Sequence, residues 1–218
     1  MDTRAGDGRL TNLEENHAMH YDPRSKDRPL PHDPLTALVV PRPIGWISTI
    51  GENGIVNLAP YSFFNAIATQ PPFVMFSSAG YKNSQDNAER TGEFVASLAT
   101  WELREQMNIT SANVGPDVSE PELAKLEMAP SVAVRPPRVK KSPWALECKY
   151  VKTVGLPGRD GKPHPYGVVI GEVVSIYIDD AFVTNGVVDT AKARPIARLG
   201  YLDQYTVVDT IFKMKRPD

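Results

Sequence analysis

The residues with the clearest chemical potential are Lys82, Asn83 and Ser84, which precede a segment of helical character at residues 85–90. Backbone N–H groups at a helix start lack intrahelical partners, and together with a lysine ammonium they can bind a phosphate group. Asn83 or Ser84 could equally be a plain N-cap, with Asp86 in the first turn satisfying the helix dipole. Taken alone, these residues favour a structural cap over a phosphate site.

Three strands are expected to position this helix start. Apolar and small residues alternate along residues 44–50, which predicts a strand. An Asn-Gly pair at residues 53–54 predicts a hairpin turn into a second strand at residues 55–58. Residues 60–65 alternate aromatic and hydrogen-bonding side chains and are expected to form a loop before a third strand at residues 73–78. Aromatic rings of such a loop can pack against a planar ligand, while hydroxyl groups can form hydrogen bonds with the polar edge of that ligand.

Several segments occur together in an order and spacing that resemble the flavin reductase-like family of FMN-binding split barrels. They read RPIGWISTI, NLAPYSFFNAIATQPPFVMFSS, YKNSQDNAERTGEFVASL, VVIGEVVSIYIDDA and ARLGYLDQY. The resemblance is sharpest over residues 41–100 and extends less sharply to about residue 209. It is more specific than any one of these motifs, because several of them match in the same order.

The resemblance implies a mainly β fold, a Greek-key FMN-binding split barrel with accessory helices. It also implies a homodimer that holds FMN near the subunit interface. We expect a polar N-terminal arm at residues 1–35 and one split-barrel domain at residues 36–218. A chain of 218 residues with 41% hydrophobic content is long enough to bury one such core.

Carried over residue by residue, the family's motifs imply a cofactor site of strand, loop and helix-start residues. These are Trp46, Ser48, Thr49, Asn57, Ala59, Pro60, Tyr61, Ser62, Ser77, Ser78, Lys82, Asn83, Ser84 and Asn87. Ser48, Thr49 and the segment from Asn57 to Ser62 would line the edge of the flavin ring. Ser77 and Ser78 would lie near the ribityl chain, and the last four residues would bind the phosphate. Trp46 could instead be a buried core indole.

Secondary candidates for the cofactor site are His164, Arg198 and Tyr201. His164 lies in a predicted turn, where an exposed histidine without a ligand is the default interpretation. For Arg198 and Tyr201, an ion pair and a packing role are as well supported as contact with the cofactor.

The resemblance further implies an NAD(P)H:flavin oxidoreductase that binds FMN, uses NADH or NADPH as co-substrate and supplies reduced flavin to a monooxygenase partner. The chemistry belongs to the flavin, so no catalytic side chain is expected. Two alternatives stay open. One is an FMN-containing electron-transfer protein without NAD(P)H activity of its own, and the other is a cofactor-free barrel that serves as an interaction module.

Composition disfavours several other classes of protein. The formal net charge of −2 disfavours nucleic acid as a partner, and the single cysteine, Cys148, excludes an internal disulfide and a Cys-x-x-Cys pair. Residues 1–30 lack an apolar core, so we expect neither a secretory signal nor a membrane span, and a cytoplasmic location. The four histidines lack the partners of a zinc site, so no metal is expected.

The remaining elements are less regular. We expect a short helix within residues 33–40, helical residues at 102–113, a loop excursion over residues 114–143 with one helix near 120–127, and a hairpin of residues 145–154 and 166–178. The glycines of that hairpin do not form a Gly-x-Gly-x-x-Gly motif in a βαβ unit, which argues against a Rossmann site. The basic run at residues 135–141 is expected to be a solvated loop rather than a phosphate contact.

Overall fold

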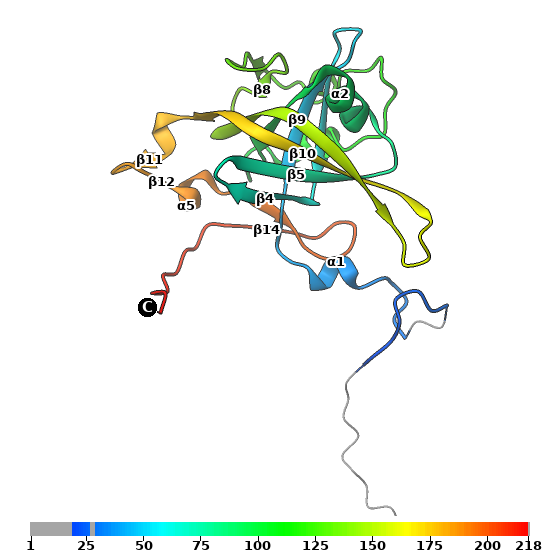
Figure 1. Ribbon diagram of the computed structural model, residues 1–218. Helices are drawn as coiled ribbons and strands as arrows, with labels where there is room; N and C mark the ends of the chain where they lie inside the picture. The colour runs from blue at the N-terminus through cyan, green and yellow to red at the C-terminus, as the bar shows by residue number, and fades with distance from the viewer. Residues whose placement is uncertain (1–18, 27–28, 218) are drawn as a thin grey trace, which may run out of the picture.

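A computed structural model describes residues 19–26 and 29–217, whose centre is a seven-stranded antiparallel sheet (Figure 1). In sheet order the strands are β3 (Val56–Tyr61), β2 (Gly45–Ile50), β6 (Glu93–Leu98), β9 (Trp144–Pro157), β10 (Pro163–Ile178), β5 (Pro72–Ala79) and β4 (Phe64–Thr69). Although β3 and β5 lie far apart in this order, they contact one another. The sheet therefore curls into a partly closed barrel.

Short helices and small sheets surround the barrel. The helices are α1 (Leu35–Leu38), α2 (Asn83–Thr91), α3 (Arg104–Ile109), α4 (Glu120–Leu123), α5 (Thr190–Ala193) and the 3-10 helix η1 (Asp180–Phe182). One small sheet has the strand order β1 (Arg42–Pro43), β13 (Ile196–Arg198) and β14 (Tyr205–Val207). Two further sheets have two strands each. One pairs β7 (Met128–Ala129) with β8 (Arg138–Val139), and the other pairs β11 (Val183–Thr184) with β12 (Val187–Val188).

Strand β2 separates two hydrophobic cores. Ile47 lies in the barrel core with Phe76 and Phe94, whereas Trp46 faces a second core that includes Met107 of α3 and Ile196 of β13. This confirms the predicted alternation. Because both faces of β2 are covered, its residues from Gly45 to Thr49 are all buried.

The structure confirms both predicted hairpins. Gly54 lies in the turn that connects β2 to β3, and it has a φ of +81°, which only glycine adopts readily. The long hairpin of β9 and β10 is also present. Shorter helices than predicted occupy the expected regions: α1 within residues 33–40, α3 within 102–113 and α4 within 120–127.

The prediction of a loop at residues 60–65 is wrong. Strand β3 continues to Tyr61 and β4 begins at Phe64, so that only Ser62 and Phe63 separate the two strands. Strand β4 pairs with β5 at the edge of the sheet, and most of its side chains are exposed. Its sequence therefore lacks the apolar alternation of a half-buried strand.

The first 18 residues of the predicted N-terminal arm, and residues 27–28, lie outside the described residues. In the basic run, Arg135 binds Glu93 through its backbone N–H (2.9 Å) and its Nε (3.2 Å). The Arg138 guanidinium lies 3.4 Å from the centroid of the Tyr177 ring. Both side chains thus have partners within the protein, and neither lines the pocket described below.

The Glu93 carboxylate should make stability depend on pH. Burial by itself would raise its pKa, but hydrogen bonds from Lys149 Nζ (2.5 Å) and Arg135 lower the pKa below its ordinary value of 4.5. A folded-state pKa below the unfolded one stabilises the protein above pH 4.5, and this stabilisation is lost as the pH falls through the folded-state pKa. Glu93→Gln should cost about 1.5–3 kcal/mol at neutral pH and less in acid.

Urea denaturation of the wild type and of Glu93→Gln at several pH values tests this expectation. The exposed Glu122 provides a matched control, Glu122→Gln. A loss of stability in Glu93→Gln that does not change with pH would show that the ion pair is not the cause.

Candidate functional site

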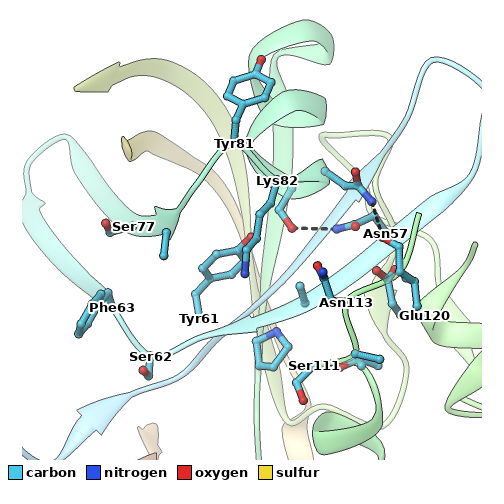
Figure 2. A pocket seen from close by; sticks show the side chains of 18 of the residues that line it. Asn57, Tyr61, Ser62, Phe63, Ser77, Tyr81, Lys82, Ser111, Asn113 and Glu120 are labelled. Atoms are coloured by element: carbon cyan, nitrogen blue, oxygen red, sulfur yellow. Dashed lines mark hydrogen bonds between the residues drawn. The ribbon is translucent and has the colours of Figure 1, made fainter. Parts of the chain in front are cut away.

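A pocket of about 370 Å³ lies between β3, the end of β5, the start of α2 and the segment that follows α3 (Figure 2). Its walls combine hydroxyl, amide and aromatic side chains with one lysine and one glutamate. The lining residues are Asn57, Ala59, Pro60, Tyr61, Ser62, Phe63, Ser77, Ala79, Tyr81, Lys82, Asn83, Ser84, Thr110, Ser111, Ala112, Asn113, Val114, Glu120 and Tyr166.

Helix α2 begins at this pocket without a capping side chain. Its N-cap is Lys82, in an extended conformation, and not Asn83 or Ser84 as predicted from the sequence. The reason lies in the fold, because the Ser84 hydroxyl accepts a hydrogen bond from Asn57 Nδ2 (2.8 Å) on β3. The first intrahelical hydrogen bond runs from the Asp86 N–H to the Lys82 carbonyl oxygen, so the N–H groups before Asp86 have no intrahelical partner and no capping side chain from the described residues.

The Lys82 side chain extends from the start of α2 into the pocket (Figure 2). No ion pair between described residues includes its ammonium group. The helix start and the lysine together concentrate positive charge on one wall of the pocket, which favours an anion there.

The floor of the pocket is a buried network of hydroxyl and amide groups. Asn57 and Ser84 are nearly fully buried, and the Tyr61 hydroxyl interacts with the hydroxyls of Ser84 and Ser78. Burial raises the pKa of the Tyr61 phenol above its ordinary value, which keeps this group neutral. The network can therefore hold polar atoms of a ligand without adding negative charge.

The opposite wall comes from residues 110–114 and Glu120, which sequence reasoning missed. Glu120 is 3% exposed, and its Oε2 accepts a hydrogen bond from the backbone N–H of Leu58 (2.9 Å). Burial raises the pKa of this carboxyl group. Small polar residues follow α3: Thr110, Ser111 and Asn113. They resemble the polar residues between the other elements of the site, and this similarity is the sequence feature that could have identified this wall.

Aromatic rings complete the pocket. Tyr61 and Phe63 come from the end of β3 and the break that follows it, and Tyr81 precedes α2. Phe64, one residue after Phe63, instead packs against the barrel core. Tyr81 and Tyr166 are further lining residues that sequence reasoning missed, because the pairing of β10 with β5 brings Tyr166 to this site.

Of the predicted cofactor residues, the structure brings nine to the pocket: Asn57, Ala59, Pro60, Tyr61, Ser62, Ser77, Lys82, Asn83 and Ser84. The other five do not line it: Trp46, Ser48, Thr49, Ser78 and Asn87. The Trp46 indole N–H donates to Thr110 Oγ1 (2.8 Å), and Asn87 Nδ2 donates to Thr49 Oγ1 (3.1 Å). Trp46 and Thr49 are buried and Asn87 is half-buried, and these three side chains bind protein partners instead of lining the pocket. Contact of these five residues with the cofactor stays a prediction.

The secondary candidates lie outside this pocket. His164 lies in the β9–β10 hairpin beside Gly158 and lines none of the cavities described here. Arg198 and Tyr201 line a neighbouring cavity, where Arg198 Nη2 donates to the Tyr201 carbonyl (3.1 Å). Among the described residues, Arg198 forms no ion pair with a carboxylate.

Within residues 19–26 and 29–217, no three His, Cys, Asp or Glu side chains come together as a metal site. No helix of these residues is long and apolar enough to cross a membrane. Cys148 is buried in the barrel core as a free thiol, and burial raises its pKa.

Comparisons with known proteins agree with this architecture. The family model described as flavin reductase like domain matches residues 37–194. An uncharacterised protein of Aquifex aeolicus is 38% identical over 172 residues, which cover 76% of this chain and 84% of that protein. Nitrilotriacetate monooxygenase component B from Bacillus cereus superposes with a TM-score of 0.77 at 32% identity, covering 83% of this chain and 90% of that chain.

Another similar structure is 2-nitrobenzoate 2-nitroreductase NbaA from Pseudomonas fluorescens. It has a TM-score of 0.74 and 26% identity, covering 84% of this chain and 88% of that chain. The matched family spans more than two thirds of the sequence and includes the strands and helix that build the pocket. The chain therefore belongs to the flavin reductase-like family of FMN-binding split barrels.

Proposed function

We propose that this chain binds FMN in the pocket at the start of α2 and acts as an NAD(P)H:flavin oxidoreductase. The observation that carries the proposal is an uncapped helix start beside Lys82, whose ammonium forms no ion pair with a described residue. In a member of an FMN-binding family, this positive wall suits the cofactor phosphate. The catalytic domain would be the split barrel of residues 36–218, preceded by the arm of residues 1–35.

The pocket offers each part of FMN a matching surface. Lys82 and the N–H groups of Asn83 and Ser84 would bind the phosphate. Ser77 would contact the ribityl chain, and Tyr61 and Phe63 would flank the flavin ring. Burial raises the pKa of the Tyr61 phenol, so this neutral group adds no negative charge near the phosphate.

FMN bound here would accept a hydride from the nicotinamide ring of NADH or NADPH. The protein would orient the cofactor and exclude water from its buried side. None of its side chains has to act as an acid or a nucleophile. This agrees with the hydrogen bonds of the site, which join side chains to one another and to the backbone as a fixed scaffold.

The similar proteins support two fates for the reduced flavin. The name of the Bacillus cereus structure, a monooxygenase component, supports delivery of reduced flavin to a separate oxygenase. The name of the Pseudomonas fluorescens structure, a nitroreductase, supports direct reduction of an aromatic acceptor. We favour the first, because the Bacillus cereus structure is the more similar in sequence, with 32% identity against 26% for the Pseudomonas fluorescens structure.

Titration with FMN tests the binding step. The protein should quench flavin fluorescence with one FMN per chain and should release the FMN on denaturation. A control with lumiflavin, which lacks the ribityl phosphate, should give much weaker binding. Unchanged flavin fluorescence at all protein concentrations would reject the pocket as an FMN site.

We also propose that the protein is a homodimer, as the resemblance to the family implies. Apolar side chains are exposed on strands β4 and β10, including Ile67 (51%) and Ile176 (59%), and a partner subunit could cover them. Sedimentation should give about twice the chain mass of 24.0 kDa. A monomer that binds FMN tightly would contradict a site shared between subunits.

A further inference from the structure

A second cavity, of about 550 Å³, adjoins the FMN pocket and contains two arginines. Arg42 and Arg198 both line it, and it shares Ser62 with the FMN pocket. A smaller hollow of about 290 Å³ links the two, because its walls include Arg198 together with Pro60 and Ser62. Arg198 therefore stands beside the entrance to the proposed flavin site.

Arg42 is a buried cation without a carboxylate partner among the residues that the structure describes. It is 6% exposed, and its guanidinium donates to the carbonyl oxygens of Thr36, Val39 (2.9 Å) and Leu199 (2.8 Å). Its Nε is buried and has no hydrogen-bond partner within residues 19–26 and 29–217. Carbonyl groups fix the position of this side chain but do not neutralise its charge, and an uncompensated buried charge is costly.

Arg198 lies directly opposite Arg42 in the pairing of β1 with β13. Burial lowers the pKa of Arg42, and the neighbouring charge of Arg198 lowers it further. Like charges that face one another across strands are destabilising unless a counter-ion joins them. No ion pair between described residues includes either arginine, although Asp33 and Asp203 also line the cavity.

Arg198 also retains capacity to bind a ligand. One of its five N–H groups donates to the Tyr201 carbonyl, and its guanidinium lies 4.5 Å from the centroid of the Tyr205 ring. The remaining donors have no partner among the described residues. A planar guanidinium with free N–H groups is suited to the paired oxygens of a phosphate.

A further cavity adjoins the arginine cavity and the linking hollow. Leu202 lines the arginine cavity, the linking hollow and this further cavity of about 660 Å³. This last cavity is bounded by the aromatic rings of Trp101 and Tyr205. The linking hollow also shares Met107, Asn108, Leu202 and Tyr205 with this last cavity, so that a proposed flavin site, a positively charged site and an aromatic site adjoin one another. A nicotinamide dinucleotide carries three corresponding groups: the reactive ring, the diphosphate and the adenine base.

We propose that Arg198 binds the diphosphate of NAD(P)H. Arg42, which lies opposite Arg198 on the neighbouring strand, would be a positioning residue whose positive charge adds to the attraction for the diphosphate. This inference rests on the proposed function and adds to it the residue that recognises the reductant. Arg198 would place the dinucleotide so that its nicotinamide reaches the flavin through the hollow beside Ser62.

Steady-state kinetics of Arg198→Gln with two reductants tests this assignment. One is NADH, and the other is 1-benzyl-1,4-dihydronicotinamide, which lacks phosphate. The variant should lose roughly 10- to 100-fold in kcat/KM for NADH, mainly through KM, because a charge-assisted hydrogen bond is removed. It should keep the wild-type kcat/KM for the phosphate-free reductant and the wild-type affinity for FMN.

Lys140→Gln provides the matched control. It removes one positive charge at an exposed ion pair with Glu127, away from the pocket, and should leave both reductants unaffected. Equal losses for NADH and for the phosphate-free reductant, or no loss for either, would overturn the assignment. A changed sedimentation mass of Arg198→Gln would also overturn it, since Arg198 would then hold the subunits together.

Calorimetry with ADP-ribose separates this inference from the proposed function. FMN-loaded wild-type protein should bind ADP-ribose, and Arg198→Gln should bind it roughly 10- to 100-fold more weakly. If the wild type fails to oxidise NADH but binds ADP-ribose through Arg198, the reductase proposal fails and the diphosphate site stands. If benzoate binds through Arg198 and ADP-ribose does not, the site recognises a carboxylate and our assignment is overturned.

Discussion

Replacing Lys82 by methionine is expected to weaken FMN binding roughly 10- to 100-fold, because a charge-assisted hydrogen bond to phosphate is worth about 1.5–3 kcal/mol. Riboflavin lacks the phosphate, so its affinity should change little. Fluorescence titrations of both ligands at one fixed salt concentration measure the two effects. The comparison isolates the phosphate contact, since the proposed ring contacts at Tyr61 and Phe63 would be the same for both ligands.

Two controls accompany the Lys82 experiment. Lys140→Met removes a lysine outside the pocket and should leave FMN binding unchanged. The thermal stability of the Lys82→Met apoprotein should stay close to that of the wild type, because Lys82 is exposed and forms no ion pair with a described residue. If FMN and riboflavin weaken equally, Lys82 does not bind the phosphate.

The largest loss of stability is expected from Phe94→Ala in the barrel core. Phe94 is fully buried, and its ring packs edge-to-face against Phe76 with centroids 5.4 Å apart. It also fills the space above Gly171, where an added Cβ would lie 2.4 Å from its ring. Truncation to alanine should therefore cost about 3–5 kcal/mol.

Urea denaturation of the apoprotein measures this loss without the stabilisation that a bound cofactor adds. Val132→Ala is the control, since Val132 is 88% exposed and its truncation should change stability by less than about 0.5 kcal/mol. A cost below about 1 kcal/mol for Phe94→Ala would contradict a well-packed barrel core.

Elements with a local pattern could be predicted from the sequence, and elements defined by their neighbours could not. The alternation along β2 and the Asn-Gly turn before β3 are local, and both predictions are confirmed. Strand β4 is held at the sheet edge by its pairing with β5, while all of its residues after Phe64 are exposed. Nothing in its sequence distinguishes it from a loop.

The same distinction applies to the site. Residues from Asn57 to Ser62 and from Lys82 to Ser84 are contiguous in the sequence, and the structure brings all but Leu58 of them to the pocket. Glu120 reaches the pocket through a hydrogen bond to Leu58, 62 residues earlier in the chain. No local pattern predicts such a contact.

Trp46 and Ser48 illustrate a different limit. The alternation of β2 predicts which residues share a face, but not that a second core covers the face away from the barrel. Trp46 is consequently a core indole whose N–H is satisfied by Thr110, the alternative that its sequence context had left open. Its link to Thr110 nevertheless connects the core to a wall of the pocket.

Anaerobic addition of NADH and then NADPH to the FMN-loaded protein is the most direct test of the proposed reductase. At least one of the two nucleotides should bleach the visible absorption of the bound flavin, with one nucleotide oxidised for each FMN reduced. If dithionite bleaches the bound flavin and neither nucleotide does, the protein carries electrons without NAD(P)H activity of its own, and the proposed function is contradicted.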